Sequence, residues 1–265
     1  DIQMGFYAMG SHDIVQGTNC PIQDEGNNII AQACYQIAKE LDVEPYDEHT
    51  GKGVLRHIIG RIGQFGWMII LVTATDNLSH QEKWVKNLTE RVPQVETIIH
   101  NVNGKRTNVI LGPRNRILYG DGTITDHIKD LRFTLSPHSF FQVNPEQTTV
   151  LYDQALAYAD LKGTEIVIDA YCGTGTISLF LAHKAKHVIG IEIVEPAIIN
   201  ARENARRNGY DNTEFIVADA AVEMPKLYKA GVRPDVIVFD PIRAGCKEEV
   251  LTSAASMEPK RIVYV

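Results

Sequence analysis

Apolar residues follow two different patterns along the 265-residue chain. In the first half they occur in short runs separated by turn-forming residues, a pattern typical of β-strands. The runs predict strands at 54–62, 67–74, 97–102, 108–111 and 131–135. Two pairs suit tight hairpins, Asn103-Gly104 and Asp121-Gly122. We therefore expect residues 1–135 to form a mainly antiparallel α+β domain.

One amphipathic helix is predicted within this half, at 81–91. Ser79 stands at the place of an N-cap, where a hydroxyl accepts a hydrogen bond from a free backbone amide.

The pattern changes at Asn144, which is a good N-cap, with Pro145 at the first helical position and Gln147 completing a capping box. A helix is therefore predicted to begin here. Its buried face is expected to carry the apolar residues that recur at helical spacing, Leu151, Ala155 and Tyr158.

Five short apolar runs follow, with helical stretches such as 196–208 between them. The runs lie at 166–168, 188–193, 215–217, 236–239 and 262–265. Strands buried on both faces and alternating with helices form parallel sheets. Residues 136–265 are therefore predicted to form an α/β domain.

Composition is ordinary for a globular protein, with 44% hydrophobic and 22% charged residues. The apolar runs are much shorter than the roughly 20 residues that span a bilayer. The first residues lack the basic start and apolar stretch of a secretory signal, so a cytoplasmic location is expected. The four cysteines form no Cys-x-x-Cys pair, which argues against a disulfide framework or a self-contained zinc site.

The net charge of −7 argues against a protein that coats nucleic acids, because affinity for phosphates comes from clustered Lys and Arg. A local basic groove stays possible, as does a merely solvated face. Two clusters could supply such a groove: Lys105, Arg106, Arg114 and Arg116, and Arg202, Arg206 and Arg207.

Candidate chemistry lies where the predicted parallel strands end, since ligands bind beyond the carboxyl ends of such strands. The first strand leads into a loop with two glycines, the first being Gly173, where backbone can approach a ligand closely. Glu192 ends the second strand, 19 residues later, about the spacing at which an acidic residue binds ribose hydroxyls. Asp219 and Asp240 follow the third and fourth strands.

A dinucleotide enzyme would use the same glycines and the same acidic residue. However, Ser178 stands where the dinucleotide motif has its third glycine. The acidic residues that follow further strands, Asp219 and Asp240, would also bind a cation better than a pyrophosphate. Both features favour S-adenosylmethionine, whose sulfonium is positively charged, over NAD.

Three segments, taken in order, resemble the RNA uracil-5-methyltransferase family. They are Ser139-Phe140-Phe141-Gln142-Val143-Asn144, the loop at 169–176, and Asp240-Pro241-Ile242-Arg243-Ala244-Gly245. The segment from Gly5 to Cys20 also looks like the start of that family's central domain. The resemblance implies a Rossmann-like class I methyltransferase sheet and methyl transfer from S-adenosylmethionine to C5 of uridine in RNA. Ribosomal RNA of the 23S type is expected in preference to transfer RNA.

Matching motifs imply that Gln142, Tyr171, Glu192 and Asp240 contact the cofactor, with Glu192 on the ribose. Asp240 would also face the target base, and Phe140 would stack on the extruded uracil. Plainer interpretations stay open. Phe140 could be a core aromatic, and Tyr171 could be a packing residue. Glu192 and Asp240 could cap the ends of strands, and Gln142 could be a polar residue at the start of a helix.

In the family, a cysteine in a Ser-Cys-Asn-Pro segment after the fifth strand attacks C6 of the base, which is covalent catalysis. The 265 residues contain no such segment, so we expect them to be part of a longer enzyme and inactive by themselves. Cys246 is not expected to replace that nucleophile.

Cys20 matches one of four cysteines that hold an iron–sulfur cluster in some relatives. The other three have no match, so a cluster is expected, if at all, only in a longer protein. Ile242 departs from the proline or small residue usual in the family, which puts the fit of the base in doubt. Two alternatives remain: an amino-group nucleic-acid methyltransferase, which Arg243 disfavours, and a non-catalytic RNA-binding module.

Overall fold

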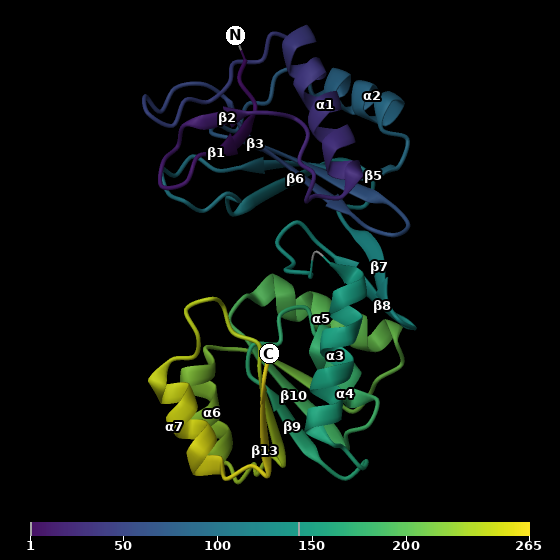
Figure 1. The fold of residues 1–265 in the computed structure, drawn as a ribbon, viewed down its shortest axis with the longest axis vertical. Coiled ribbons are helices and arrows are strands. Elements are labelled where there is room, and N and C mark those ends of the chain that lie inside the picture. Colours follow the sequence, from purple (N-terminus) through teal and green to yellow (C-terminus); the bar gives the residue numbers. More distant parts are fainter. Residues whose placement is uncertain (1, 143) are drawn as a thin grey trace. The chain divides into compact units, whose positions relative to one another are not determined.

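A computed structural model describes residues 2–142 and 144–265 of the chain (Figure 1). Val143, part of the motif around Phe140, therefore lies outside the described residues. The chain divides into two compact units, Asp1–Thr125 and Asp126–Val265, and each is described by itself.

The first unit contains a four-stranded sheet in the order β3-β4-β5-β6. Its strands are β3 (Leu55–Ile62), β4 (Trp67–Thr73), β5 (Val95–Val102) and β6 (Arg114–Tyr119). Neighbours are antiparallel except for β4 and β5, which are parallel because helix α2 (Gln81–Arg91) connects them as a crossover. A separate antiparallel pair, β1 (Gly5–Tyr7) and β2 (Ile14–Gln16), precedes the sheet.

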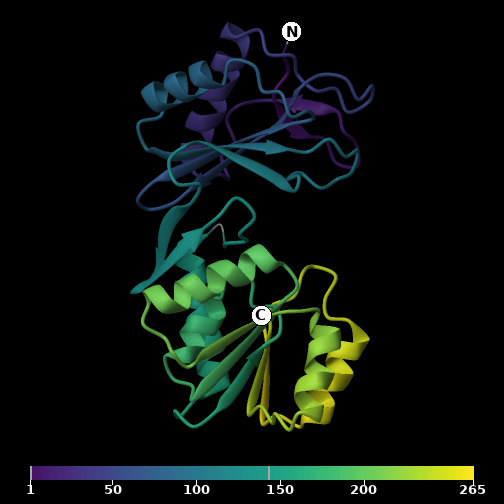
Figure 2. The same cartoon turned by 180° about the vertical axis from the view of Figure 1, so that it is seen from behind.

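Helices α1 (Glu25–Glu40) and α2 cover one face of this sheet (Figure 2). Ile37, Leu71 and Trp84 are fully buried between the helices and the sheet. The sequence did not predict α1, because Gly26 and two asparagines in its first turns are poor helix formers. Gly26 is needed there, since a Cβ would lie 2.8 Å from the Ile62 side chain.

Four local predictions in this unit were wrong. The N-cap of α2 is His80, in the left-handed region with φ 59°, and not Ser79. Residues 108–111 form no strand, because the Asn103 side chain donates hydrogen bonds to the carbonyl oxygens of Val109 and Ile110, at 2.6 and 2.9 Å. These bonds fold the segment into a loop in place of a tight hairpin. Asp121-Gly122 joins strands of two different sheets, which also excludes a hairpin.

The second unit contains a five-stranded, wholly parallel sheet in the order β11-β10-β9-β12-β13. Its strands are β9 (Ile166–Asp169), β10 (His187–Glu192), β11 (Thr213–Val217), β12 (Val236–Phe239) and β13 (Arg261–Tyr264). All five lie within a residue or two of the predicted runs, which confirms the predicted parallel α/β fold.

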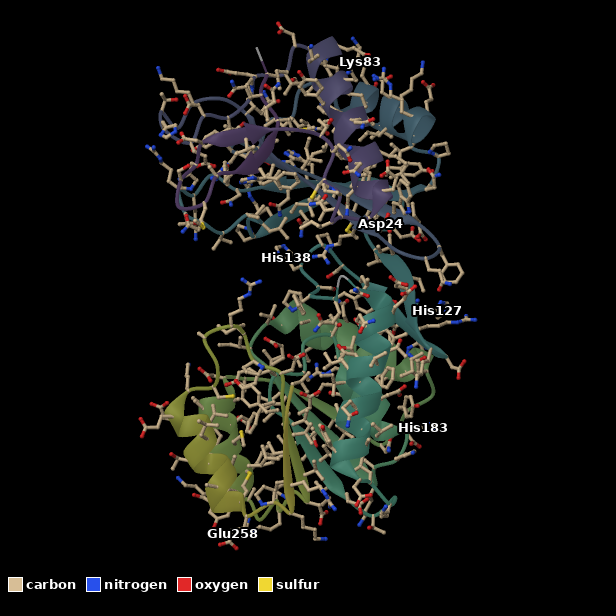
Figure 3. All side chains as sticks on the ribbon, in the orientation of Figure 1. Asp24, Lys83, His127, His138, His183 and Glu258 are labelled. Carbon is tan, nitrogen blue, oxygen red and sulfur yellow. The ribbon has the colours of Figure 1, made fainter. Side chains whose placement is uncertain are left out.

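Five helices enclose this sheet on its two faces (Figure 1). They are α3 (Pro145–Ala159), α4 (Thr176–Ala182), α5 (Glu195–Arg207), α6 (Ala220–Lys229) and α7 (Glu248–Met257). The pair α6 and α7 packs on one face, over Ile168, Ile237 and Phe239, and the other three helices lie on the opposite face. Glu258, labelled in Figure 3, ends α7 at the edge of the sheet where the strands begin.

Helix α3 begins as predicted, since Asn144 Oδ1 accepts a hydrogen bond from the Gln147 backbone amide at 3.0 Å. Of its predicted buried face, Ala155 is buried, but Leu151 and Tyr158 are exposed. The buried residues are Thr148, Tyr152, Ala155 and Ala159. Tyr152 sets this orientation by packing edge-on against Phe180 of α4, with ring centroids 5.3 Å apart.

A further two-stranded sheet contains β7 (Ile124–Ile128) and β8 (Leu131–Leu135). The Thr134 amide of β8 donates to Asn204 Oδ1 of α5 at 2.7 Å, so β8 packs with the second unit. The sequence placed the domain boundary after residue 135, ten residues beyond this division. No helix in residues 2–142 and 144–265 is long and apolar enough to cross a membrane.

Candidate functional site

The strand order reverses at β9, whose neighbours β10 and β12 continue the sheet in opposite directions. Such a reversal opens a crevice beyond the carboxyl ends of the strands, where α/β proteins bind ligands. Asp169, at the end of β9, is in register with Gly190 of β10 and Val238 of β12. Glu192 and Asp240 each follow these partners by two residues, so the three acidic residues gather at one edge.

Asp169 is fully buried between them. Ser178 Oγ donates a hydrogen bond to Asp169 Oδ2 at 2.6 Å, whereas Asp169 Oδ1 has no hydrogen-bond partner in the described part of the chain. Burial raises the pKa of this carboxyl to about 7, the Ser178 hydrogen bond opposes the shift, and the Asp240 and Glu192 carboxylates add to it. The upward shift shows that the three carboxyl groups lie close enough to repel one another, so this edge of the sheet favours a cation over an anion.

The two flanking carboxylates are accessible to a ligand. Glu192 is partly buried, and its Oε1 accepts a hydrogen bond from the Val194 amide at 2.9 Å, which fixes the side chain. Asp240 is also partly buried, and burial raises its pKa. A fixed carboxylate at a strand end can accept hydrogen bonds from two neighbouring hydroxyls, as a ribose requires.

Tyr152 connects Gln142 to this group. Its hydroxyl lies 3.0 Å from Thr176 Oγ1, at the start of α4, and also hydrogen-bonds the Gln142 side chain. Burial raises the pKa of Tyr152 to about 12, and the Asp240 and Asp169 carboxylates contribute to the shift. The structure thus brings Gln142 to the same edge of the sheet as the acidic residues.

The two loop glycines have different local roles. Gly173 has φ +52°, and a Cβ there would meet nothing within 4 Å, so its backbone is open to a ligand. Gly175 has φ +82°, and a Cβ there would lie 3.1 Å from Ala201 and from Phe215. The first glycine therefore fits the predicted close approach to a ligand, and the second allows dense packing.

Tyr171 has a structural contact besides its predicted role. Its hydroxyl hydrogen-bonds the Cys246 thiol and the Lys247 amide, and burial and Cys246 raise its pKa to about 12. Cys246 also hydrogen-bonds Tyr264, at the end of β13. Tyr171 therefore links the glycine loop to the loop that follows β12, and its contact with a cofactor stays a prediction.

Both carboxylate oxygens of Asp219 are bound by nearby residues of the chain. Its Oδ1 accepts from the Ala221 amide at 2.9 Å and caps α6, and its Oδ2 binds Lys247 Nζ at 2.6 Å. The Lys247 ion pair is the main cause that lowers the pKa of Asp219. Its predicted role at the cofactor stays a prediction.

Phe140 is not a core residue, because its side chain is 70% exposed. Phe141 takes the inner position and packs against Phe133, with ring centroids 5.9 Å apart. An exposed aromatic ring suits stacking on a nucleobase, although that role is untested.

Cys20 lies in the first unit, where its backbone amide donates to Asn28 Oδ1 at 2.8 Å. Across the described residues, no three His, Cys, Asp or Glu side chains are grouped so that they could hold a metal ion. A metal role for Cys20 therefore stays a prediction about a longer protein.

The predicted basic clusters are partly neutralised. Arg114 and Arg116 both pair with Asp76, and Arg206 and Arg207 both pair with Glu203. Neither cluster therefore presents its full formal charge to a phosphate.

Sequence reasoning missed four of the residues that build the crevice. Asp169, Thr176 and Ser178 lie in or beside the glycine loop, but were considered only for their spacing. Tyr152 was missed because the apolar residues Leu151 and Tyr158 were assigned to the buried face of the helix, whereas both are exposed. The spacing of Thr148, Tyr152, Ala155 and Ala159 contains the correct signal.

The second unit also matches known proteins. Residues 161–262 match the sequence profile of a family described as a methyltransferase domain. The chain is 49% identical over 263 residues to an uncharacterized RNA methyltransferase of Halalkalibacterium halodurans, covering 98% of this chain and 57% of that protein. It is 48% identical over 269 residues to an uncharacterized RNA methyltransferase of Clostridium acetobutylicum, covering 100% of this chain and 58% of that protein. The chain thus spans a little over half the length of these relatives.

A solved structure is similar over nearly the whole chain. It is the tRNA (uracil-54, C5)-methyltransferase of Pyrococcus abyssi in complex with S-adenosyl-L-homocysteine, with a TM-score of 0.79 and 25% identity. The match covers 97% of this chain and 62% of that one. The second unit therefore has a Rossmann-like class I methyltransferase fold.

Proposed function

We propose that this chain forms the cofactor-binding and RNA-facing part of an S-adenosylmethionine-dependent enzyme that methylates C5 of uridine in RNA. The observation that carries the proposal is the gathering of Glu192, Asp240 and Gln142 around buried Asp169 at the reversal of the sheet. The RNA methyltransferases among its relatives support the substrate class.

S-adenosylmethionine, when bound, supplies a methyl group made electrophilic by its sulfonium. Glu192 would accept hydrogen bonds from the ribose hydroxyls, because its position at the end of β10 leaves Oε2 free for them. The open backbone at Gly173 would lie against the cofactor, and Gln142, held by Tyr152, would contact it from the other side of the loop. The excess negative charge suits a cation and disfavours a pyrophosphate.

The target base would lie between Phe140 and Asp240. Phe140 offers an exposed ring that replaces the stacking lost when a base leaves its strand. The Asp240 carboxyl, partly buried and with a raised pKa, can exchange hydrogen bonds with the polar edge of uracil. The family resemblance favours ribosomal RNA, whereas the similar Pyrococcus abyssi enzyme acts on tRNA.

We expect the 265 residues to bind without turnover, because they contain no Ser-Cys-Asn-Pro segment. Cys246 does not replace that nucleophile, since its thiol is engaged by the hydroxyls of Tyr171 and Tyr264.

Titration calorimetry tests the cofactor assignment directly. The chain should bind S-adenosylmethionine, and Glu192→Gln should weaken binding at least about tenfold, because one hydrogen-bonding carboxylate is replaced by a neutral amide. Glu214→Gln is the matched control, since this exposed carboxylate lies near the opposite end of the same sheet. Absence of binding by the unaltered chain, or equal binding by Glu192→Gln, contradicts the proposal.

Photocrosslinking tests the base assignment. RNA that carries 5-iodouridine at one position should crosslink to the peptide that contains Phe140, and Phe140→Leu should abolish the crosslink. Fragments of 23S ribosomal RNA should compete better than tRNA. Crosslinking only to other peptides would exclude Phe140 as the stacking residue, and stronger competition by tRNA would reverse the choice of RNA.

A further inference from the structure

The first unit contains a pocket lined by both polar and aromatic side chains. Its volume is about 400 Å³, within the range of small-ligand sites. It is lined by residues of the β1–β2 pair, of β3, and of two loops, among them Tyr7, His12, Glu48, His57 and Asn108. Neither the cofactor site nor the proposed stacking residue belongs to this unit.

Glu48 provides the negative group of this pocket. Its side chain is 13% exposed, and its Oε1 binds Arg56 Nη2 at 2.6 Å and Arg56 Nε at 3.1 Å. Glu48 Oε2 accepts no hydrogen bond from any residue that the structure describes, although a buried carboxylate normally has several partners. It is therefore available to a ligand with hydrogen-bond donors.

Arg56 itself cannot reach a ligand. Its side chain is 1% exposed, and its Nη1 donates to the carbonyl oxygens of Asn103 and Lys105, both at 2.8 Å. Its guanidinium also stacks on the Tyr46 ring at 4.6 Å. Arg56 thus holds Glu48 in place and contributes no open cationic group to the pocket.

Three aromatic side chains, Tyr7, His12 and His57, form part of the remaining wall. Tyr7 packs edge-on against His12 and His57, with ring centroids 5.2 and 6.2 Å apart. Burial and the nearby Arg56 lower the pKa of His57 to about 4, and burial raises the pKa of Tyr7, so both groups are neutral near pH 7. Such side chains accept a flat aromatic ligand, and the Glu48 carboxylate beside them repels a phosphate.

Positive charge is found at the rim instead. Arg106 Nη2 donates to the carbonyl oxygens of Glu48 and His49, both at 3.0 Å, which places this exposed arginine beside the pocket. Lys105 precedes it in the chain and is also exposed, and its backbone carbonyl oxygen accepts a hydrogen bond from Arg56 Nη1. A cationic rim around an aromatic pocket with a free carboxylate suits a nucleotide, with its phosphate outside and its base inside.

We propose that this pocket binds an unpaired guanine of the substrate RNA. Guanine has two adjacent donors, N1–H and the N2 amino group, that the single free oxygen Oε2 can accept together through its two lone pairs, whereas uracil, cytosine and adenine each present fewer donors on that edge. The inference rests on the proposed function only in taking RNA as the ligand.

Fluorescence anisotropy with a labelled seven-nucleotide oligouridine tests this inference. An oligomer with one central guanosine should bind at least about tenfold more tightly than those with inosine or adenosine there. Inosine is the sharpest comparison, because it lacks only the N2 amino group. Equal affinity for the three oligomers overturns the proposal, as does tighter binding of an arginine-rich peptide to the same pocket.

Variants separate recognition from folding. Glu48→Gln keeps one oxygen for Arg56 but removes the free carboxylate oxygen, and should abolish the preference for guanosine. His12→Ala should weaken the binding of all three oligomers to a similar degree. Glu44 is an exposed carboxylate in the same loop as Glu48, and Glu44→Gln should leave all three affinities unchanged. A preference that survives Glu48→Gln overturns the proposal. The calorimetric titration with S-adenosylmethionine is independent, so failure here leaves the methyltransferase assignment intact.

Discussion

Ser178 Oγ donates to Asp169 Oδ2 at 2.6 Å where both side chains are fully buried. Ser178 occupies the position at which a dinucleotide motif has its third glycine, and here it supplies a side-chain hydrogen bond to a buried carboxyl. The departure from the dinucleotide motif is therefore a requirement of the acidic crevice.

Ser178→Ala should lower the free energy of unfolding by about 1–3 kcal/mol, because Asp169 loses its side-chain donor in a buried position. Urea denaturation measures the change. Ser256→Ala is the control, since that exposed hydroxyl donates only to the Thr252 carbonyl oxygen and should cost much less. Equal losses in the two variants would contradict a special role for Ser178.

The contribution of Asp169 to the free energy of unfolding should fall as pH rises from about 4 to about 7, in the direction opposite to that of His57, whose pKa is lowered to about 4. The folded chain holds a proton on Asp169 up to about pH 7, whereas the unfolded chain releases it near 3.8, so the folded state binds more protons in this interval. Each pH unit then removes up to about 1.4 kcal/mol from the free energy of unfolding. Asp169→Asn should flatten this dependence relative to the unaltered chain, while exposed Asp211→Asn should not. Denaturation at several pH values checks both.

Affinity for S-adenosylmethionine should rise by up to about tenfold between pH 6 and 8, because ionised Asp169 attracts the sulfonium. S-adenosylhomocysteine has a neutral sulfur and should show a smaller rise. Calorimetry at both pH values distinguishes the two ligands. Identical pH profiles would place the sulfonium away from Asp169.

Cys34 and Cys172 should resist alkylation in the folded chain. Burial raises the pKa of the Cys34 thiol to about 12 and that of Cys172 well above its ordinary value, and the thiolate is the reactive form. Cys20 and Cys246 are only partly buried and should react first. Mass spectrometry after brief iodoacetamide treatment gives the order, and Cys172 reacting as fast as Cys246 would contradict it.

Gly190→Ala should destabilise the second unit by about 1–3 kcal/mol through overpacking. A Cβ at this position would lie 2.6 Å from the Phe215 ring and 2.9 Å from Cys172 Sγ. Gly17→Ala is the control, since a Cβ there meets nothing within 4 Å. Thermal unfolding of both variants measures the difference, and a neutral Gly190→Ala would show that the ring can move aside.

The parallel half of the fold could be predicted because strands buried on both faces are continuous apolar runs, as in 236–239. The ends of these runs also predicted that Glu192 and Asp240 lie at one edge of the sheet, as they do. The antiparallel half was harder to predict, because Asn103 uses its side chain to fold a loop where a hairpin was expected. Helix α1 was not predicted because its first turn contains a poor helix former, Gly26, which close packing against Ile62 requires.

Side-chain networks lay beyond the sequence. Tyr152 reaches Gln142 and Thr176 only because α3 turns a particular face inward, and helical periodicity left that face ambiguous by one residue. The Glu48 and Arg56 pair joins a loop to a strand, and no local pattern predicts such a contact.

The contacts of Cys246 with Tyr171 and Tyr264 restrain the loop that follows β12. One end of this loop leaves the sheet at Phe239, and the other is tethered where the thiol meets Tyr171 and Tyr264. A turn between Ile242 and Gly245, closed by a 2.8 Å hydrogen bond, shortens the free span further. These contacts restrain the segment with Ile242 and Arg243 at both ends, so we expect it to move as one piece without unfolding.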